Sequence, residues 1–217
     1  MKALAINGSP RKGWSTATLL ENALDGCAAN GAQVEMVHLY DHSYRGCTSC
    51  FGCKRLGGQG YGRCNMRDEL TPILDKAAGA EVLILGSPFY FHAETGEMRS
   101  FMERLLFPYL SYTPDNASIF PGKIRTAFFY TMNITEKDMP AFYQDSSVAA
   151  TRAIMTRIFG SCEILLCTDT YQFADYSKYL STAWDAEAKA SRREDVFPRD
   201  CALAYELGAQ LVQAART

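Results

Sequence analysis

A short polar loop near the N-terminus joins an apolar run to a helical pattern. Residues 2–6 read Lys-Ala-Leu-Ala-Ile, which is typical of a buried strand, and residues 15–29 repeat Leu and Ala at helical spacing. The connecting stretch, Asn7–Thr18, reads NGSPRKGWSTAT. A helix N-terminus presents unpaired backbone N–H groups and the positive end of the helix dipole, so this arrangement favours an anion. The stretch therefore predicts a phosphate-binding loop at the end of the first strand.

The residues of this loop indicate which kind of phosphate it binds. Gly8 and Gly13 have the spacing of the GxxxxGK[ST] loop that binds nucleoside triphosphates, but Trp14 stands where that loop needs its lysine. The loop does not match the GxGxxG fingerprint of dinucleotide-binding proteins either. Its several hydroxyl side chains suit a terminal monophosphate, such as that of flavin mononucleotide (FMN). The alternative is an ordinary strand-to-helix turn that Ser15 or Thr16 caps.

Three further apolar runs, and one stretch that alternates polar and apolar residues at 33–38, alternate with helical patterns along the rest of the chain. Strands are predicted at residues 33–38, 82–85, 126–130 and 164–167, and helices at 68–78, 98–105, 146–159, 176–193 and 198–215. Strands that alternate with helices form a parallel sheet with helices on both faces. We therefore predict an α/β protein with a flavodoxin-like, doubly wound, five-stranded parallel sheet in the order 2-1-3-4-5. Residues 1–217 are expected to form a single domain.

A second conspicuous loop follows the third predicted strand. Residues 87–96 read SPFYFHAETG, and three consecutive aromatic side chains cannot all be buried in one direction. In the predicted order, strands one and three are neighbours at the switch point, where ligands bind at the carboxyl ends of the strands. This loop, the phosphate loop and residues 131–133 are therefore expected to surround one planar ligand, such as the isoalloxazine ring of FMN. The alternative is an aromatic cluster that only caps the core.

Three stretches of the chain resemble one family of flavoproteins. GSPRKGWSTATLL, CTSCFGCK and SPFYFHAETGEMRSFMERL look like the NADPH-dependent FMN reductase family, and its iron–sulfur flavoprotein branch in particular. The resemblance runs in register from Met1 to about Thr135. It implies a flavodoxin-like fold, bound FMN and a homodimer or homotetramer. By position, the resemblance assigns the phosphate to Ser9, Arg11, Ser15, Thr16 and Thr18. It assigns the ring to Pro88, Phe89, Tyr90, Phe91, Thr95 and Gly96. The residues expected to face the ring are Thr131, Met132 and Asn133.

Four of the eight cysteines lie in a loop at residues 46–64. Cys47, Cys50 and Cys53 form a C-x₂-C-x₂-C run, and Cys64 follows after a ten-residue spacer. Thiols at this spacing suit three irons of a [4Fe–4S] cluster, with a fourth thiol completing the set, whereas zinc sites more often pair two C-x₂-C motifs. The spacer is longer and richer in glycine than in the resembling branch, and unligated thiols are the alternative. The other cysteines are expected to be core residues: Cys27, Cys162, Cys167 and Cys201.

The overall composition narrows the range of partners. A net charge of −2 gives no general attraction to nucleic acid or to a membrane surface. The N-terminus lacks the apolar segment of a signal peptide, and no stretch approaches the roughly 18 apolar residues of a membrane span. We therefore expect a cytoplasmic protein whose cysteines stay reduced and serve metal binding or redox chemistry.

These patterns lead to one main functional hypothesis. We expect an FMN-dependent oxidoreductase that passes electrons from NAD(P)H or a reduced carrier to a quinone, a flavin or another acceptor. No catalytic side chain is assigned, because the sequence shows no Ser/His/Asp group and no paired carboxylates, and a flavin carries such chemistry itself. Two alternatives stay open. One is an electron-transfer carrier without its own nicotinamide site, and the other is a metal-binding module without flavin.

Overall fold

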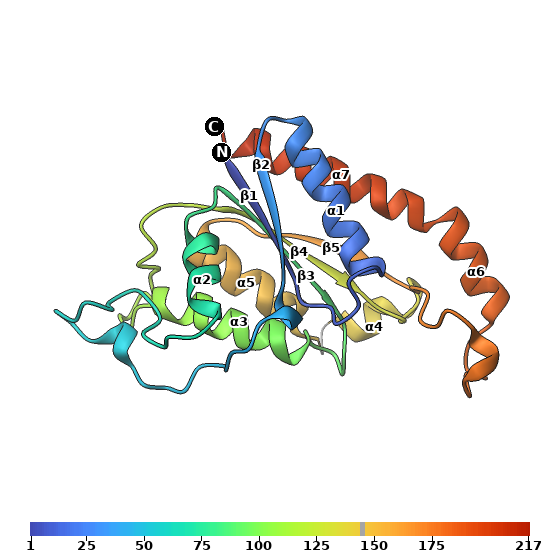
Figure 1. Cartoon of the computed structure of the whole chain (residues 1–217), viewed down its shortest axis with the longest axis horizontal. Coiled ribbons are helices and arrows are strands. Elements are labelled where there is room, and N and C mark those ends of the chain that lie inside the picture. The colour runs from blue at the N-terminus through green and yellow to red at the C-terminus, as the bar shows by residue number, and fades with distance from the viewer. Residues whose placement is uncertain (144–145) are drawn as a thin grey trace.

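A single parallel sheet of five strands forms the centre of the protein (Figure 1). The computed structural model describes residues 1–143 and 146–217. The strands are β1 (Lys2–Asn7), β2 (Gln33–His38), β3 (Val82–Pro88), β4 (Arg125–Thr131) and β5 (Glu163–Cys167). Their order is β2-β1-β3-β4-β5, with every neighbouring pair parallel. The predicted flavodoxin-like sheet is therefore confirmed, including its order.

Helices cover both faces of this sheet (Figure 1). One face packs against α1 and α7, and the other against α2, α3 and α5. A short helix, α4, precedes α5, and a polar helix, α6, leads directly into α7. Their bounds are α1 Ser15–Ala29, α2 Leu70–Ala78, α3 Gly96–Leu106, α4 Met139–Tyr143, α5 Ser147–Phe159, α6 Ala186–Asp195 and α7 Phe197–Ala214. None of the helices within the described ranges is long and apolar enough to cross a membrane.

The burial of each strand follows its place in the sheet. Residues 82–85 of β3 are completely buried, as expected for a central parallel strand that is covered on both faces. Residues 33–35 of β2 are exposed, because β2 is an edge strand. Because all the strands are parallel, the carboxyl ends of β1, β3, β4 and β5 meet at one edge of the sheet. Ligands bind at this edge in doubly wound folds.

The predicted helix over 176–193 is wrong in its first half. Only Tyr176–Lys178 forms a short 3₁₀ turn, and α6 begins ten residues later than predicted, at Ala186. The cause is Asp185, whose carboxylate accepts hydrogen bonds from the backbone N–H groups of Glu187 (2.9 Å) and Ala188 (3.2 Å). A side chain that caps a helix in this way fixes its first residue.

Smaller differences between the predicted and the observed elements concern where helices and strands begin and end. The α2 helix begins at Leu70, because the Asp68 carboxylate accepts the N–H of Leu70 and so ends the preceding loop. The β3 strand continues through Ser87 and Pro88, where Pro88 is in register with Thr131 of β4, so the loop after β3 begins at Phe89. The five-residue helix α4 was not predicted.

Candidate functional site

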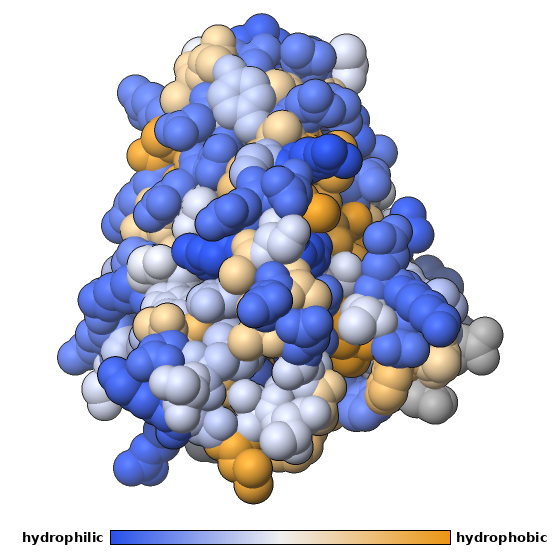
Figure 2. Space-filling view, turned by 90° about the vertical axis from the view of Figure 1, so that its right-hand side faces the viewer, coloured by the Kyte–Doolittle hydropathy of each residue, from blue (hydrophilic) through white to orange (hydrophobic). Residues whose placement is uncertain are grey.

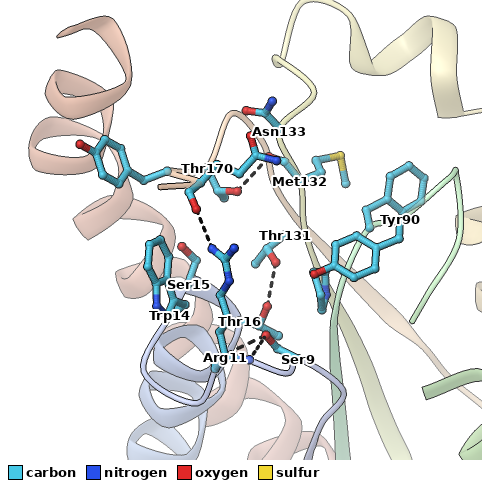
Figure 3. A pocket seen from close by; sticks show the side chains of 14 residues that line it. Ser9, Arg11, Trp14, Ser15, Thr16, Tyr90, Thr131, Met132, Asn133 and Thr170 are labelled. Atoms are coloured by element: carbon cyan, nitrogen blue, oxygen red, sulfur yellow. Dashed lines mark hydrogen bonds between the residues drawn. The ribbon is translucent and has the colours of Figure 1, made fainter. Parts of the chain in front are cut away.

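A pocket lies at the carboxyl edge of the sheet, among the loops that follow β1, β3, β4 and β5 (Figure 3). Each of these four loops contributes side chains to it. The lining residues are Ser9, Arg11, Trp14, Ser15, Thr16, Pro88, Phe89, Tyr90, Thr131, Met132, Asn133, Thr170, Tyr171 and Gln172. The phosphate loop, the aromatic loop and the loop after β4 thus meet in space, as their positions after neighbouring strands require.

The α1 helix begins at this pocket without a side-chain cap. Trp14 occupies the N-cap position, and neither Ser15 nor Thr16 caps the helix, so the alternative of an ordinary capped turn is wrong. The hydroxyl-bearing residues Ser9, Ser15 and Thr16 are nevertheless buried here. The Thr16 hydroxyl lies 2.7 Å from that of Thr131, which joins the loops after β1 and β4. The free N–H groups and hydroxyls form a site suited to an anion.

Arg11 spans one side of the pocket. Its guanidinium carbon lies 4.6 Å from the centre of the Trp14 ring, and Nη1 donates a hydrogen bond of 2.6 Å to the carbonyl of Gln172 (Figure 3). The arginine therefore connects the loop after β1 to the loop after β5. It also places a permanent positive charge beside the uncapped helix end, which further favours an anion there.

The aromatic loop separates its three aromatic side chains. Tyr90 and Ala93 exchange two backbone hydrogen bonds (2.8 and 3.0 Å) across a tight turn in which Phe91 and His92 have φ of 49° and 66°. Phe89 packs edge-on against Tyr130, with ring centres 5.9 Å apart, and Tyr90 lines the pocket. Phe91 at the tip of the turn is 100% exposed.

A buried carboxylate anchors this loop from behind. The side chain of Glu94 is completely buried, and its Oε1 accepts hydrogen bonds from the hydroxyls of Tyr130 (2.5 Å) and Thr151 (2.7 Å). Burial, together with the adjacent carboxylate, raises the pKa of Tyr130 far above its ordinary value. Glu94 Oε2 has no hydrogen-bond partner in the described ranges, and Arg99 Nη1 lies 3.8 Å from it. The loop is thus tied to β4 and α5.

Four residues that the sequence assigned to FMN do not line this pocket: Thr18, Phe91, Thr95 and Gly96. The Thr18 hydroxyl donates to the carbonyl of Trp14 (3.3 Å) within α1. The Thr95 hydroxyl caps α3 and donates to the carbonyl of Gly8 (2.8 Å), so it holds the aromatic and phosphate loops together. Conversely, the sequence analysis did not assign Trp14 of the phosphate loop to the site, and it missed Thr170, Tyr171 and Gln172, which follow β5. Their place after the fifth parallel strand was the available signal, because that strand ends at the same edge.

The cysteine-rich loop forms a second site. Cys47, Cys50, Cys53 and Cys64 line one small cavity against the C-terminal end of α3, and none of them forms a disulfide. Ser49 and Phe51, which separate the first cysteines, have φ of 54° and 55° and so curl the loop tightly. The predicted cluster ligands therefore share one cavity.

Two basic side chains fix this loop in place. Arg104 of α3 is buried, pairs with Asp68 (2.5 Å) and donates through Nε to Cys64 Sγ (3.3 Å). The ammonium of Lys54 donates to the backbone carbonyls of residues 107, 108 and 110, just beyond α3. Both contacts hold the loop against the same helix end.

The four thiols can be compared with what a metal ion and a cluster each require. Within residues 1–143 and 146–217, no three His, Cys, Asp or Glu side chains converge as ligands of one metal ion. A [4Fe–4S] cluster instead takes one thiolate on each iron, so its donors surround a volume rather than a point. Four thiols around one cavity match that requirement in kind and number.

The sheet order, with a polar loop and an uncapped helix at the switch point, defines a flavodoxin-like protein whose pocket is suited to an anion. A sequence model of the NADPH-dependent FMN reductase family matches residues 1–134, and the chain belongs to this family.

Individual relatives agree with this assignment. An iron–sulfur flavoprotein of Methanocaldococcus jannaschii is 35% identical over 104 residues, which are 48% of this chain and 51% of that protein. An iron–sulfur flavoprotein of Archaeoglobus fulgidus is 34% identical over 104 residues, or 48% of each protein. The matching part of the chain thus spans about half the length of these curated relatives.

Solved structures share the fold along nearly the whole chain. An FMN-dependent NADH-azoreductase of Bacillus anthracis in complex with FMN has a TM-score of 0.68 at 13% identity, covering 98% of this chain and 100% of that one. An NAD(P)H:quinone oxidoreductase of Methanothermobacter marburgensis has a TM-score of 0.65 at 14% identity, covering 97% and 96%. At such low identity, the likeness shows the fold alone.

Proposed function

We propose that this protein is an FMN-dependent oxidoreductase that passes electrons from NAD(P)H or a reduced carrier to a quinone, a flavin or another acceptor. Its family supports FMN as the cofactor. The observation that carries the proposal is the pocket itself, where an uncapped helix end with Arg11 lies opposite a wall formed by Phe89 and Tyr90. FMN, when bound, supplies both two-electron and one-electron chemistry. The protein supplies position and electrostatics.

The pocket residues divide into two groups by chemistry. Ser9, Arg11, Ser15 and Thr16 would hold the phosphate, since they surround the free N–H groups of α1. The aromatic loop and residues 131–133 would contact the ring. Gln172 lines the same pocket, and its side-chain oxygen is buried without a hydrogen-bond partner within the described part of the chain. This unused acceptor suits a hydroxyl of the ribityl chain.

A second candidate function is an iron–sulfur flavoprotein that carries electrons without its own nicotinamide site. Four thiols around one cavity favour it, and they would hold a [4Fe–4S] cluster: Cys47, Cys50, Cys53 and Cys64. The α3 helix begins next to Thr95 in the aromatic loop and ends at this cavity. A helix of 11 residues is about 16 Å long, so one rigid element links the two sites.

We also propose that the protein assembles as a homodimer or homotetramer. The complete exposure of Phe91, beside the half-exposed Tyr90 at the rim of the pocket, supports this proposal. An exposed aromatic pair next to a ligand site is typical of a surface that a partner covers. Sedimentation of the FMN-loaded protein tests it, and a monomer at all concentrations would contradict it.

One set of measurements tests the function. An anaerobic visible spectrum of the purified protein, with iron and acid-labile sulfide assays, is expected to show flavin absorbance and about four irons per chain. Rapid flavin bleaching by NADPH or NADH would support the reductase, and its absence would favour the carrier. Flavin absorbance without iron would contradict the presence of a cluster. A colourless protein that FMN does not reconstitute would contradict the proposal.

The phosphate site has its own test. Arg11→Ala is expected to weaken FMN binding by roughly 10- to 100-fold, because a charge-assisted contact is worth about 1.5–3 kcal/mol. Riboflavin, which lacks the phosphate, should bind wild type and Arg11→Ala almost equally. Fluorescence quenching on binding to the apoprotein measures both. An equal loss for riboflavin and FMN would argue against a phosphate at Arg11.

A further inference from the structure

A buried lysine holds the α6 helix against the pocket loops. Lys189 is 3% exposed and is the only buried residue of α6, whose other side chains are at least partly exposed. The surface on this side of the molecule is largely hydrophilic (Figure 2). An ammonium is costly to bury unless it is paired and hydrogen-bonded. The contacts of this side chain therefore help to fix a helix that has no apolar stripe, together with the ion pair of Arg192 with Asp200 of α7 (2.9 Å).

The partners of Lys189 belong to two loops that line the pocket. Its Nζ donates to Oδ1 of Asn133 in the loop after β4, and to Oδ1 of Asp169 and the carbonyl of Thr170 in the loop after β5. Asn133 and Thr170 are both pocket residues. Asp169 has φ of 51°, a left-handed conformation that non-glycine residues rarely adopt. The ion pair with Lys189 helps to stabilise it.

Backbone hydrogen bonds join the same two loops directly. The N–H of Asp169 donates to the carbonyl of Ile134 (2.8 Å), and the N–H of Thr170 donates to the carbonyl of Met132 (2.9 Å). The backbone of both loops is therefore already fixed. What Lys189 adds is control over the Asn133 side chain, which the backbone bonds do not reach.

The chemistry of an ammonium determines how this amide is oriented. A lysine has three donors and no acceptor, so the side chain of Asn133 must turn its oxygen toward Lys189. Its NH₂ group is then directed away from Lys189, and it makes no hydrogen bond to any described residue. Figure 3 shows Asn133 at the wall of the pocket. This residue of the pocket wall thus carries a hydrogen-bond donor whose orientation is set by a buried charge.

We infer that Lys189 is a positioning residue that fixes Asn133 as a hydrogen-bond donor to an acceptor atom on the edge of the bound ring. This inference rests on the proposed FMN site. The pyrimidine edge of an isoalloxazine ring carries such acceptors and becomes more negative when the flavin is reduced. A fixed donor there favours the reduced form. Because Asp169 balances the lysine charge, the effect passes mainly through the Asn133 amide rather than through a net charge.

Three single variants test the inference in the full-length protein. Lys189→Met keeps most of the buried stem but removes the donor, and it is expected to weaken FMN binding at least 10-fold and to make the flavin midpoint potential more negative. Asn133→Asp replaces the donor with an acceptor at nearly constant shape, and the same two changes are expected. Lys178→Met is the matched control, since Lys178 lies in the short turn Tyr176–Lys178 that precedes α6 and its side chain is 73% exposed. It should leave both quantities unchanged.

A double-mutant comparison separates positioning from a merely structural role. In an Asn133→Leu background, Lys189→Met is expected to change FMN affinity less than two-fold, because the amide it orients is gone. An undiminished effect in that background would overturn the inference, as would wild-type affinity and potential in Lys189→Met. If Lys189→Met does not fold, Asn133→Asp decides alone, and an unchanged affinity and potential would overturn it. Wild-type protein that binds no FMN would instead refute the proposed function itself.

Discussion

At the scale of single residues, three buried charged side chains among the described residues lie behind the loops of the two candidate sites. Glu94 lies behind the aromatic loop, Lys189 behind the loops after β4 and β5, and Arg104 behind the cysteine-rich loop. Each is hydrogen-bonded to groups from other elements. Since an unpaired buried charge is strongly unfavourable, such residues hold their loops in one arrangement.

The Glu94 site predicts a difference between two substitutions. Glu94→Leu leaves the buried hydroxyls of Tyr130 and Thr151 without their acceptor, and we expect a loss of about 3 kcal/mol in unfolding free energy. Glu94→Gln keeps one oxygen acceptor and should lose clearly less. Urea denaturation of both variants measures the difference. Equal losses would mean that these hydrogen bonds do not determine the stability of the loop.

The Asp68–Arg104 pair predicts a pH dependence. Burial alone would raise the pKa of Asp68, but its hydrogen bond to Arg104 and the positive charge of that residue outweigh burial and lower it. Because the folded pKa lies below the value of about 3.9 expected when unfolded, the pair stabilises the protein fully at neutral pH. That stability is lost as the pH falls below about 4 toward the folded pKa.

Asp68→Asn is therefore expected to lower the unfolding free energy at pH 7 by about 3 kcal/mol, since Arg104 is then buried without a counter-charge. Between pH 5 and pH 3, the unfolding free energy of the variant should also decline less than that of the wild type. The difference should be about as large as the free energy that the pair contributes. Urea denaturation across this range is the measurement. The exposed Glu35, whose carboxylate pairs with Lys76 at the surface, provides the control variant Glu35→Gln, for which little change is expected. An unaltered pH profile in Asp68→Asn would contradict the assignment.

Much of the candidate pocket could be predicted from the sequence, because hydroxyl, glycine and aromatic residues cluster directly after predicted strands. Ten of the assigned FMN residues do line the pocket, and the four that do not lie in the same two segments. Lys189 and Glu94 could not be predicted. Whether a charged side chain is buried depends on partners far away in the sequence, and neither residue belongs to an apolar pattern.

At the scale of elements, the crossing of α1 and α7 is unusually close. A Cβ added to Gly26 would lie 2.0 Å from the carbonyl oxygen of Tyr205, and one added to Gly208 would lie 2.0 Å from that of Ala23. The two helices therefore touch through their backbones. The contact requires that these two positions carry no side chain. It does not require the backbone flexibility of glycine.

Gly26→Ala is expected to destabilise the protein by about 2 kcal/mol, because overpacking outweighs the roughly 1 kcal/mol that alanine gains in helix propensity. The added methyl group meets backbone atoms, which cannot move aside as a flexible side chain would. Gly122→Ala is the control, since a Cβ there meets nothing within 4 Å. Thermal and urea unfolding measure both. A stabilised Gly26→Ala variant would show that the helices can separate at low cost.

The elements themselves differ in how well their sequences predict them. Most of the strands can be recognised as apolar runs, of which the central strand at residues 82–85 is the most continuous, whereas the edge strand at residues 33–38 is recognisable from its alternation of polar and apolar residues. The α6 helix was placed too early, since a polar segment has no periodicity to mark its start and only the cap at Asp185 fixes it. The α4 helix, with five residues, is too short to show a period at all.

At the scale of the whole molecule, the two candidate sites lie on different parts of the fold. The pocket is built from loops at the carboxyl edge of the sheet, and no residue of the cysteine-rich loop lines it. The cysteine cavity is lined by residues from the stretch 47–66 and from the C-terminal end of α3 and just beyond it. The linings of the two sites have no residue in common, so binding at one should not require the other.

FMN is accordingly expected to stabilise the protein whether or not iron is present. A ligand that binds only the folded state at 100 times its dissociation constant adds about 2.7 kcal/mol to the unfolding free energy. We expect this gain in untreated protein and in protein stripped of iron by a chelator, and a much smaller gain in Arg11→Ala at the same FMN concentration. Urea denaturation followed by circular dichroism measures all three. If the gain disappeared with the iron, the cysteine-rich loop and the pocket would have to fold as one cooperative unit, which the separate linings of the two cavities argue against.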